Sequence, residues 1–115
     1  MKKEYRIKKS TEIQQLIRKR NTVGNSYFIL YFNENHENIN FRYALSVPKK
    51  YGNAVKRNLM KRRIREIIKV QQFKQQYDFF IVVKNKAKNL AFEEIQTLLK
   101  NLFVKANILG EKNEN

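Results

Sequence analysis

Residues Lys49 to Lys69 carry nine basic side chains and the single acid Glu66, which leaves a net charge of +8 on roughly one helix and its lead-in. A solvated helix face normally mixes both signs of charge to form i,i+4 pairs, so repelling cations at this density need a ligand that neutralises them. Arginine adds more than charge, because its planar guanidinium binds two phosphate oxygens at once and stacks on bases. The pattern therefore predicts a surface that binds a polyanion, RNA or DNA.

Apolar residues recur at helical spacing in this stretch and predict a helix from about residue 54 to residue 70. Pro48 ends the preceding segment, and the turn residues Gly52 and Asn53 lead into the helix. At about 100° per residue, one arc holds four apolar side chains and the neighbouring arc holds the polar and basic ones: Met60, Ile64, Ile67 and Ile68, then Asn58, Lys61, Arg62, Arg65 and Lys69. We expect one face in the core, a basic face beside it and Arg57 at the edge between them.

Side chains for acid, base or metal chemistry are scarce. A metal-dependent nuclease needs clustered carboxylates or histidines, and a metal-free RNA cleaver usually needs a histidine pair. His36 is the single histidine and stands in a polar stretch, and Asp78 is expected at the start of a strand. Glu93 and Glu94 fit the first turn of a helix, where they complement its dipole. We therefore expect no catalytic residue and no metal ligand in the protein itself.

Composition indicates one folded, strongly basic domain. The 115 residues carry a formal net charge of +15, and residues 1–20 and 49–69 together hold nearly all of that excess. A hydrophobic content of 42%, with eight phenylalanines and six tyrosines, favours a packed core over a disordered basic tail. We expect residues 1–110 to form a single RNA-binding domain and residues 111–115 to form a frayed tail.

The sequence gives no sign of a membrane partner or of secretion. No apolar stretch approaches spanning length, and the charged amino terminus lacks the apolar core of a signal peptide. The chain has no cysteine, which excludes disulfides and thiolate metal sites. A cytoplasmic location is the expectation.

Around the basic helix, the sequence predicts a small α+β domain. We expect a first helix at residues 11–20, strands at 27–32, 41–47 and 78–83, and a last helix carrying the apolar stripe of residues 95–106. The first two strands are expected to pair antiparallel, and residues 21–25 have turn chemistry. A helix between two strands of one sheet implies a crossover, so a single sheet packed with helices is the simplest architecture.

The segment KKYGNAVKRNLMKRRIRE, residues 49–66, closely resembles the signature of the protein subunit of bacterial ribonuclease P. The spacing of KK, GNAV, RN, KR and RE is the specific part of this resemblance. It extends to YRIKK at 5–9, VGNSYFILYF at 23–32, RYALSVPKK at 42–50 and the late strand and helix, which is nearly the whole chain.

This resemblance implies a more specific fold than the residues alone predict. Members of the family have an α-β-β-β-α-β-α order, with one more strand than the patterns above indicate, and a small, mainly antiparallel sheet. Their βαβ crossover is left-handed, as in the second domain of ribosomal protein S5. General rules of chain connection favour the opposite hand.

The resemblance also implies a division of labour. In the family, the catalytic centre belongs to an RNA subunit that holds most of the Mg²⁺, and the enzyme removes the 5′ leader of precursor tRNA to give mature 5′ ends. The protein subunit alone is not expected to cleave RNA. Carried over to this chain, the residues that contact the catalytic RNA are Lys49, Lys50, Lys56, Arg57, Asn58, Lys61, Arg62 and Arg65.

The leader is held in the family between the first helix and the sheet. The matching residues here are Lys9, Ile13, Ile17, Ile29 and Tyr31. Many members have phenylalanine at the two helix positions, and an aliphatic side chain cannot stack on a base as an aromatic ring does. Plain core packing is therefore the alternative role for both helix isoleucines.

Two other positions depart from the common signature of the family. Leu59 stands where arginine is common, and Ser26 stands where a basic residue is frequent. Lys56 and Arg63 could restore the lost charge from other angles.

Two other classes of protein fit the composition. A ribosomal or ribosome-associated RNA-binding protein would have the same size and charge, and the spacing of KRNLMKRRIRE is what argues against it. A nonspecific DNA-binding protein is the second alternative, but no recognition helix with base-reading side chains is visible, so no stable DNA partner is expected. The predicted partners are ribonuclease P RNA and precursor tRNA.

Overall fold

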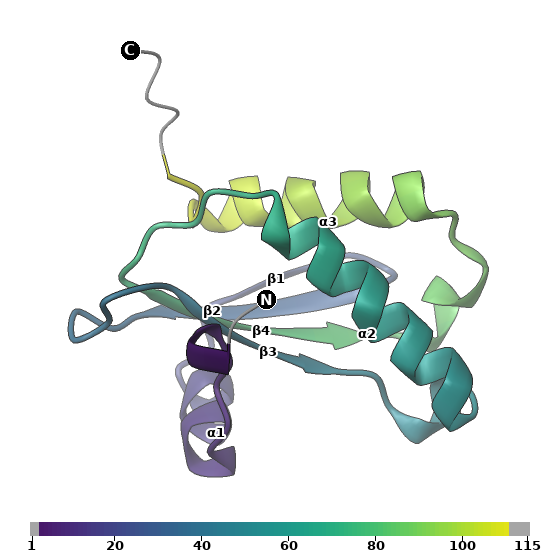
Figure 1. Cartoon of the computed structure of the whole chain (residues 1–115), viewed down its shortest axis with the longest axis horizontal. Coiled ribbons are helices and arrows are strands. Elements are labelled where there is room, and N and C mark those ends of the chain that lie inside the picture. Colours follow the sequence, from purple (N-terminus) through teal and green to yellow (C-terminus); the bar gives the residue numbers. More distant parts are fainter. Residues whose placement is uncertain (1–2, 111–115) are drawn as a thin grey trace.

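The computed structural model describes residues 3–110, which form a four-stranded sheet with helices on both faces (Figure 1). Helices α2 and α3 cover one face, and α1 packs on the other. The elements are η1 (Lys3–Tyr5), α1 (Ser10–Arg18), β1 (Thr22–Gly24), β2 (Phe28–Glu34), β3 (Arg42–Ser46), η2 (Lys49–Tyr51), α2 (Ala54–Lys69), β4 (Tyr77–Val83), η3 (Asn85–Asn89) and α3 (Phe92–Ala106). This is the α-β-β-β-α-β-α order that the resemblance implied.

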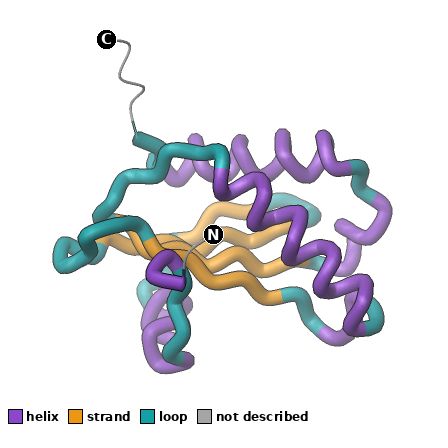
Figure 2. Tube along the Cα trace, in the orientation of Figure 1, coloured by secondary structure: helices purple, strands orange, loops and turns teal. Residues whose placement is uncertain are grey.

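The strand order is β1-β2-β4-β3, so the predicted pairing of the first two long strands, β2 and β3, is wrong (Figure 2). Strand β4 lies between them, antiparallel to β2 and parallel to β3. Its residues explain this place, because Phe79 and Ile81 are fully buried on one face of the sheet and Phe80 is buried on the other. A strand that is apolar on both faces gains most from an inner position.

The parallel pair arises because β3 reaches β4 through α2, which forms the expected crossover. The left-handed sense of this crossover stays a prediction from the resemblance. Strand β1 pairs antiparallel with β2, with Thr22 opposite Tyr31. The residues alone predicted a turn at this place, since a three-residue strand is too short to show an alternating pattern.

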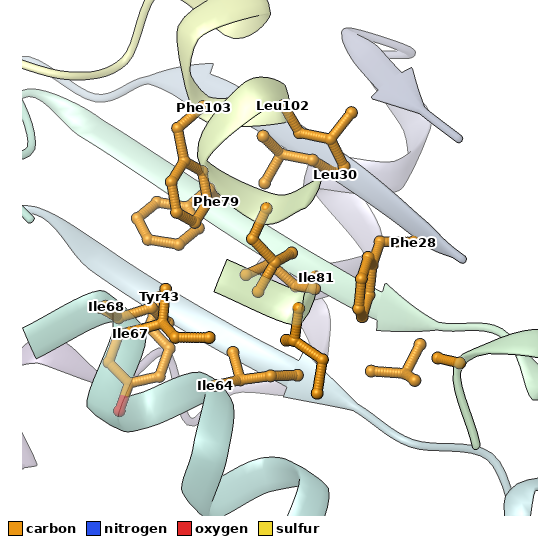
Figure 3. Packing of buried hydrophobic residues seen from close by; sticks show 14 of the residues in the cluster. Phe28, Leu30, Tyr43, Ile64, Ile67, Ile68, Phe79, Ile81, Leu102 and Phe103 are labelled. Carbon is orange, nitrogen blue, oxygen red and sulfur yellow. The ribbon is translucent and has the colours of Figure 1, made fainter. Parts of the chain in front are cut away.

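The main core lies between the sheet and the two helices above it. Figure 3 shows α2 contributing Ile64, Ile67 and Ile68, and α3 contributing Leu102 and Phe103. The sheet side of this core includes the buried residues Phe28, Leu30, Tyr43, Phe79 and Ile81. The predicted apolar arc of the basic helix is therefore confirmed.

A smaller apolar cluster occupies the opposite face of the sheet. Its buried members are Ile7, Leu16, Ala44 and Phe80, and the half-buried residues Ile13, Tyr31 and Val82 pack against it. Helix α1 ends at Arg18, two residues earlier than predicted, and Arg20 adopts a left-handed φ of 58° that cannot continue a helix. This short helix leaves part of the sheet face uncovered (Figure 1).

Two further expectations concern the limits of the domain. The predicted frayed tail at residues 111–115 lies outside the described residues. Among residues 3–110, no helix is long and apolar enough to cross a membrane.

Candidate nucleic-acid interface

The start of the basic helix is fixed by local hydrogen bonds. The Asn53 side chain caps α2 by accepting a bond from the backbone N–H of Lys56 at 3.0 Å. Just before it, η2 closes through a 2.9 Å bond from the Tyr51 N–H to the Pro48 carbonyl. Pro48, which has no N–H donor, and the Asn53 cap thus set where the helix begins.

One flank of α2 presents Arg57, Asn58, Lys61 and Arg65, which we call the ridge. Arg57, Lys61 and Arg65 follow each other at intervals of four residues and therefore lie along one side of the helix. Their side chains are half-buried, and the Nε atoms of Arg57 and Arg65 are covered without any hydrogen-bond partner in the described structure. The aliphatic parts of the two arginine side chains therefore pack against the protein, while their Nε–H groups have no acceptor within residues 3–110.

No acid neutralises the ridge within residues 3–110. The three ion pairs found there are His36 with Glu34, Arg42 with Glu12, and Arg42 with Asp78. None involves a side chain of α2, although Glu66 lies on the same helix. An unpaired row of cations raises local repulsion and favours the binding of phosphates.

The other predicted RNA contacts are spread around the ridge. Lys49 and Lys50 are exposed on η2, one turn before α2, and Arg62 is exposed on the solvent side of α2. Lys56 lies on the opposite flank of the helix, where it lines a pocket with Arg63. The structure therefore gathers most of the predicted set on and before α2, but it does not place Lys56 on the ridge.

Two of the five predicted leader residues meet at the small cluster beneath the sheet. Ile13 and Tyr31 both pack against it, and the Tyr31 ring stacks on Phe80 with ring centroids 6.0 Å apart. Ile29 faces the same side one row along, opposite Val82 of β4. Ile17 is 40% exposed at the edge of α1, and Lys9 is exposed just before the helix.

An ion-pair network that sequence reasoning missed anchors α1 to the sheet. The Nη2 atom of Arg42 lies 2.6 Å from the Glu12 Oε2 of α1 and 2.8 Å from the Asp78 Oδ2 of β4. The Arg42 Nε donates to Asp78 Oδ1 at 3.1 Å, and the Asn38 amide donates to the same oxygen at 2.7 Å. The hydrogen bond with Asp78 is the main reason that the pKa of Arg42 is raised, against the opposing effect of burial.

This network explains why a buried carboxylate is tolerated in the strand. Asp78 is 7% exposed, and it has Arg42 and two asparagine amides as partners. A charged residue next to the continuous apolar run of this strand was the available signal, because a buried charge needs a paired partner. Neighbouring carboxylates do not form a metal centre: among the described residues, no group of three or more potential ligands could hold a metal ion.

Comparison with known proteins gives one consistent family. The model of the family described as ribonuclease P matches residues 1–107. The ribonuclease P protein component of Phytoplasma australiense is 42% identical over 115 residues, covering 98% of this chain and all of that protein. The component from Acholeplasma laidlawii is 37% identical and is matched over the full length of both chains.

Solved structures agree with the sequence relatives. The ribonuclease P protein of Staphylococcus aureus superposes with a TM-score of 0.85 at 36% identity, covering 92% of this chain and 98% of that one. Sequence and fold thus favour ribonuclease P over the ribosomal alternative. The chain belongs to the family of bacterial ribonuclease P protein components, the protein subunits of the ribonucleoprotein endoribonuclease that processes the 5′ ends of tRNA.

Proposed function

We propose that this chain serves tRNA processing by binding two RNAs on opposite faces of its sheet. The catalytic RNA would lie along the ridge, with Lys49, Lys50, Lys56 and Arg62 as further phosphate contacts. The 5′ leader of precursor tRNA would lie beside α1, against Ile13, Ile29 and Tyr31, with Ile17 and Lys9 at its border. The observation that carries the proposal is the ridge, a row of cations without acidic partners in the described chain.

Phosphate binding by the ridge follows from its chemistry. Lys61 supplies a mobile ammonium charge. Arg57 and Arg65 supply planar guanidinium groups on half-buried side chains. Each phosphate that they neutralise releases counterions, so binding should weaken steeply as salt rises. These side chains already lie in a row on a capped helix, so RNA binding costs little conformational entropy, which favours affinity.

Leader binding follows from the uncovered part of the sheet. Tyr31 offers a ring face and a hydroxyl on a strand, and Phe80 behind it keeps the ring in place. Stacking on an aromatic ring tolerates any base, which suits leaders of varied sequence. Ile13 would then contribute van der Waals contact, while its packing against Leu16 and Phe80 is also a core role.

In this scheme the protein positions RNA and does not transfer protons. Mg²⁺, held mainly by the catalytic RNA, would activate the attacking water and stabilise the leaving oxygen. The protein would lower the Mg²⁺ requirement by neutralising phosphates that repel each other when the two RNAs meet. Residues 1–110 would act as one domain in the cytoplasm, where precursor tRNA is processed.

The test is cleavage of a 5′-extended precursor tRNA at low Mg²⁺, with a bacterial ribonuclease P RNA alone, this protein alone, and both together. We expect cleavage only in the mixture. Cleavage by the protein alone would contradict the assignment of catalysis to RNA. A mixture no faster than the RNA alone would remove the proposed role and return the ribosomal alternative.

A further inference from the structure

A pocket of about 390 Å³ lies on the flank of α2 opposite the ridge. It is bounded by α2, by Tyr51 of η2 and by Lys88 of η3. The short helix η3 precedes α3 (Figure 1). The volume of the pocket lies in the range that holds a single small ligand. Of the lining residues, Lys56 alone belongs to the predicted RNA contacts, whereas Arg63 and Lys88 belong to neither group.

Three cations from two distant parts of the chain converge on this pocket. Lys56 and Arg63 come from α2 and Lys88 comes from η3, and no acidic side chain is among the lining residues. None of the three takes part in an ion pair within residues 3–110. Convergence of like charges raises the energy of the free protein, and a bound anion would remove that cost.

Tyr51 adds a neutral donor to the cationic wall. Its side chain is 6% exposed, and burial raises the pKa of its hydroxyl although the nearby charge of Arg63 lowers it. The hydroxyl is therefore protonated at neutral pH and can donate a hydrogen bond. A donor beside three cations fits the oxygens of a phosphate.

Besides Asn89, the remaining lining residues are apolar, which distinguishes the pocket from a simple anion site. Met60 is buried at its base, and Leu59 is 42% exposed beside it. An exposed leucine next to cations suits a ligand with one charged and one flat apolar part. A nucleotide has this division, and unpaired RNA presents its base and phosphate in this way.

We propose that this pocket binds one unpaired nucleotide of the catalytic RNA. Lys56, Arg63 and Lys88 would neutralise its phosphodiester, the Tyr51 hydroxyl would donate to a phosphate oxygen, and the nucleoside would cover Leu59. The RNA would then hold α2 from both flanks. The leader is not the occupant, because its proposed surface lies on the other face of the sheet (Figure 1). This inference rests on the proposed function, since it assumes that the catalytic RNA lies along α2.

The test compares two lysines of η3 that carry the same charge. Lys88 lines the pocket, whereas Lys86 is exposed two residues away and does not. The Kd of labelled ribonuclease P RNA would be measured from low to high KCl for wild type, Lys88→Gln and Lys86→Gln. We expect Lys88→Gln to weaken binding about fivefold and to reduce the salt slope by about one, and Lys86→Gln to stay within about twofold of wild type.

Arg57→Ala serves as the control for the ridge, and thermal unfolding confirms that each variant is folded. If Arg57→Ala weakens binding while Lys88→Gln behaves like Lys86→Gln, the pocket inference is wrong and the proposed function stands. If neither Arg57→Ala nor Lys88→Gln weakens binding, both fail together. A Lys88→Gln defect seen only when the preassembled holoenzyme binds precursor tRNA would also overturn the assignment to the catalytic RNA.

Discussion

Arg42 lies where helix α1 meets the sheet, and its guanidinium contacts a carboxylate on each side. Asp78 is nearly buried, so its charge depends on Arg42 and on two asparagine amides for stabilisation. Removal of one partner from such a group costs more than the pair itself contributes, because the other charge is left unpaired. Arg42 of β3 therefore helps to position α1, together with the packing of Leu16 and Ile13 against the sheet.

Arg42→Met should lower the free energy of unfolding by about 2 to 3 kcal/mol, because it leaves Asp78 buried without its main partner. Urea unfolding followed by circular dichroism would measure this change. Arg18→Met, which removes an exposed cation from α1, is the control and should change stability by less than about 0.5 kcal/mol. Equal losses in both variants would show that the network contributes no more than surface charge.

Tyr31 illustrates how one residue can serve both packing and binding. Its ring contacts the small cluster on one side, and its half-buried state leaves part of the ring open. Leucine can keep the packing against Phe80 but cannot stack on a base.

Tyr31→Leu should weaken binding of leader-bearing precursor tRNA to the holoenzyme about tenfold, because one stacking contact is lost. Binding of mature tRNA should remain unchanged. The two affinities would be measured with the same preassembled holoenzyme. Equal weakening for both RNAs would mean that Tyr31 only packs the sheet face.

At the scale of elements, α2 carries three distinct surfaces on one helix. Its core face packs in the main cluster, the ridge occupies one flank, and the cationic pocket occupies the other. With basic side chains at nine positions between residues 49 and 69, this segment repels itself, and the Asn53 cap offsets part of that cost. No acidic residue in its first turn supports the helix dipole.

Asn53→Ala should therefore destabilise the protein by about 1 kcal/mol, because the N–H of Lys56 loses its acceptor. Thermal and urea unfolding would measure the loss. Asn101→Ala is the matched control, since Asn101 is exposed within α3 and alanine favours helix there. A loss for Asn101→Ala as large as that for Asn53→Ala would contradict the capping role.

At the scale of the whole molecule, charge is concentrated where the two RNAs are proposed to bind. The segment around α1 and the segment around α2 hold nearly all of the net charge of +15, and the sheet separates them. The acids Glu12 and Asp78 instead form ion pairs with Arg42. In the proposed function, these two basic segments would face two RNAs that otherwise repel each other.

Arg57→Ala combined with Arg65→Ala should reduce the salt slope of binding to ribonuclease P RNA by about two while leaving stability nearly unchanged. Lys100→Ala combined with Lys105→Ala removes the same charge from exposed positions of α3 and should leave the slope near that of wild type. Binding titrations across KCl concentrations would measure the salt slope of each double variant. Identical slopes for the two double variants would show that net charge, and not the ridge, governs affinity.

The sequence by itself determined the local features of this protein. The spacing of Met60, Ile64, Ile67 and Ile68 identified the core face of α2, because helical periodicity is a property of neighbouring residues. The density of lysine and arginine around them predicted an RNA surface on the same helix, and this assignment stays a prediction. The long strands and the last helix were also found close to their observed bounds.

Only the tertiary structure decided which distant residues meet. The insertion of β4 between β2 and β3, the pairing of short β1 and the contact of Arg42 with Glu12 depend on competition among many partners for burial. The same holds for the pocket, where Lys88 of η3 comes beside Arg63 of α2. Local propensity fixes which face of an element is apolar, but strand order and side-chain partners follow from the packing of the whole chain.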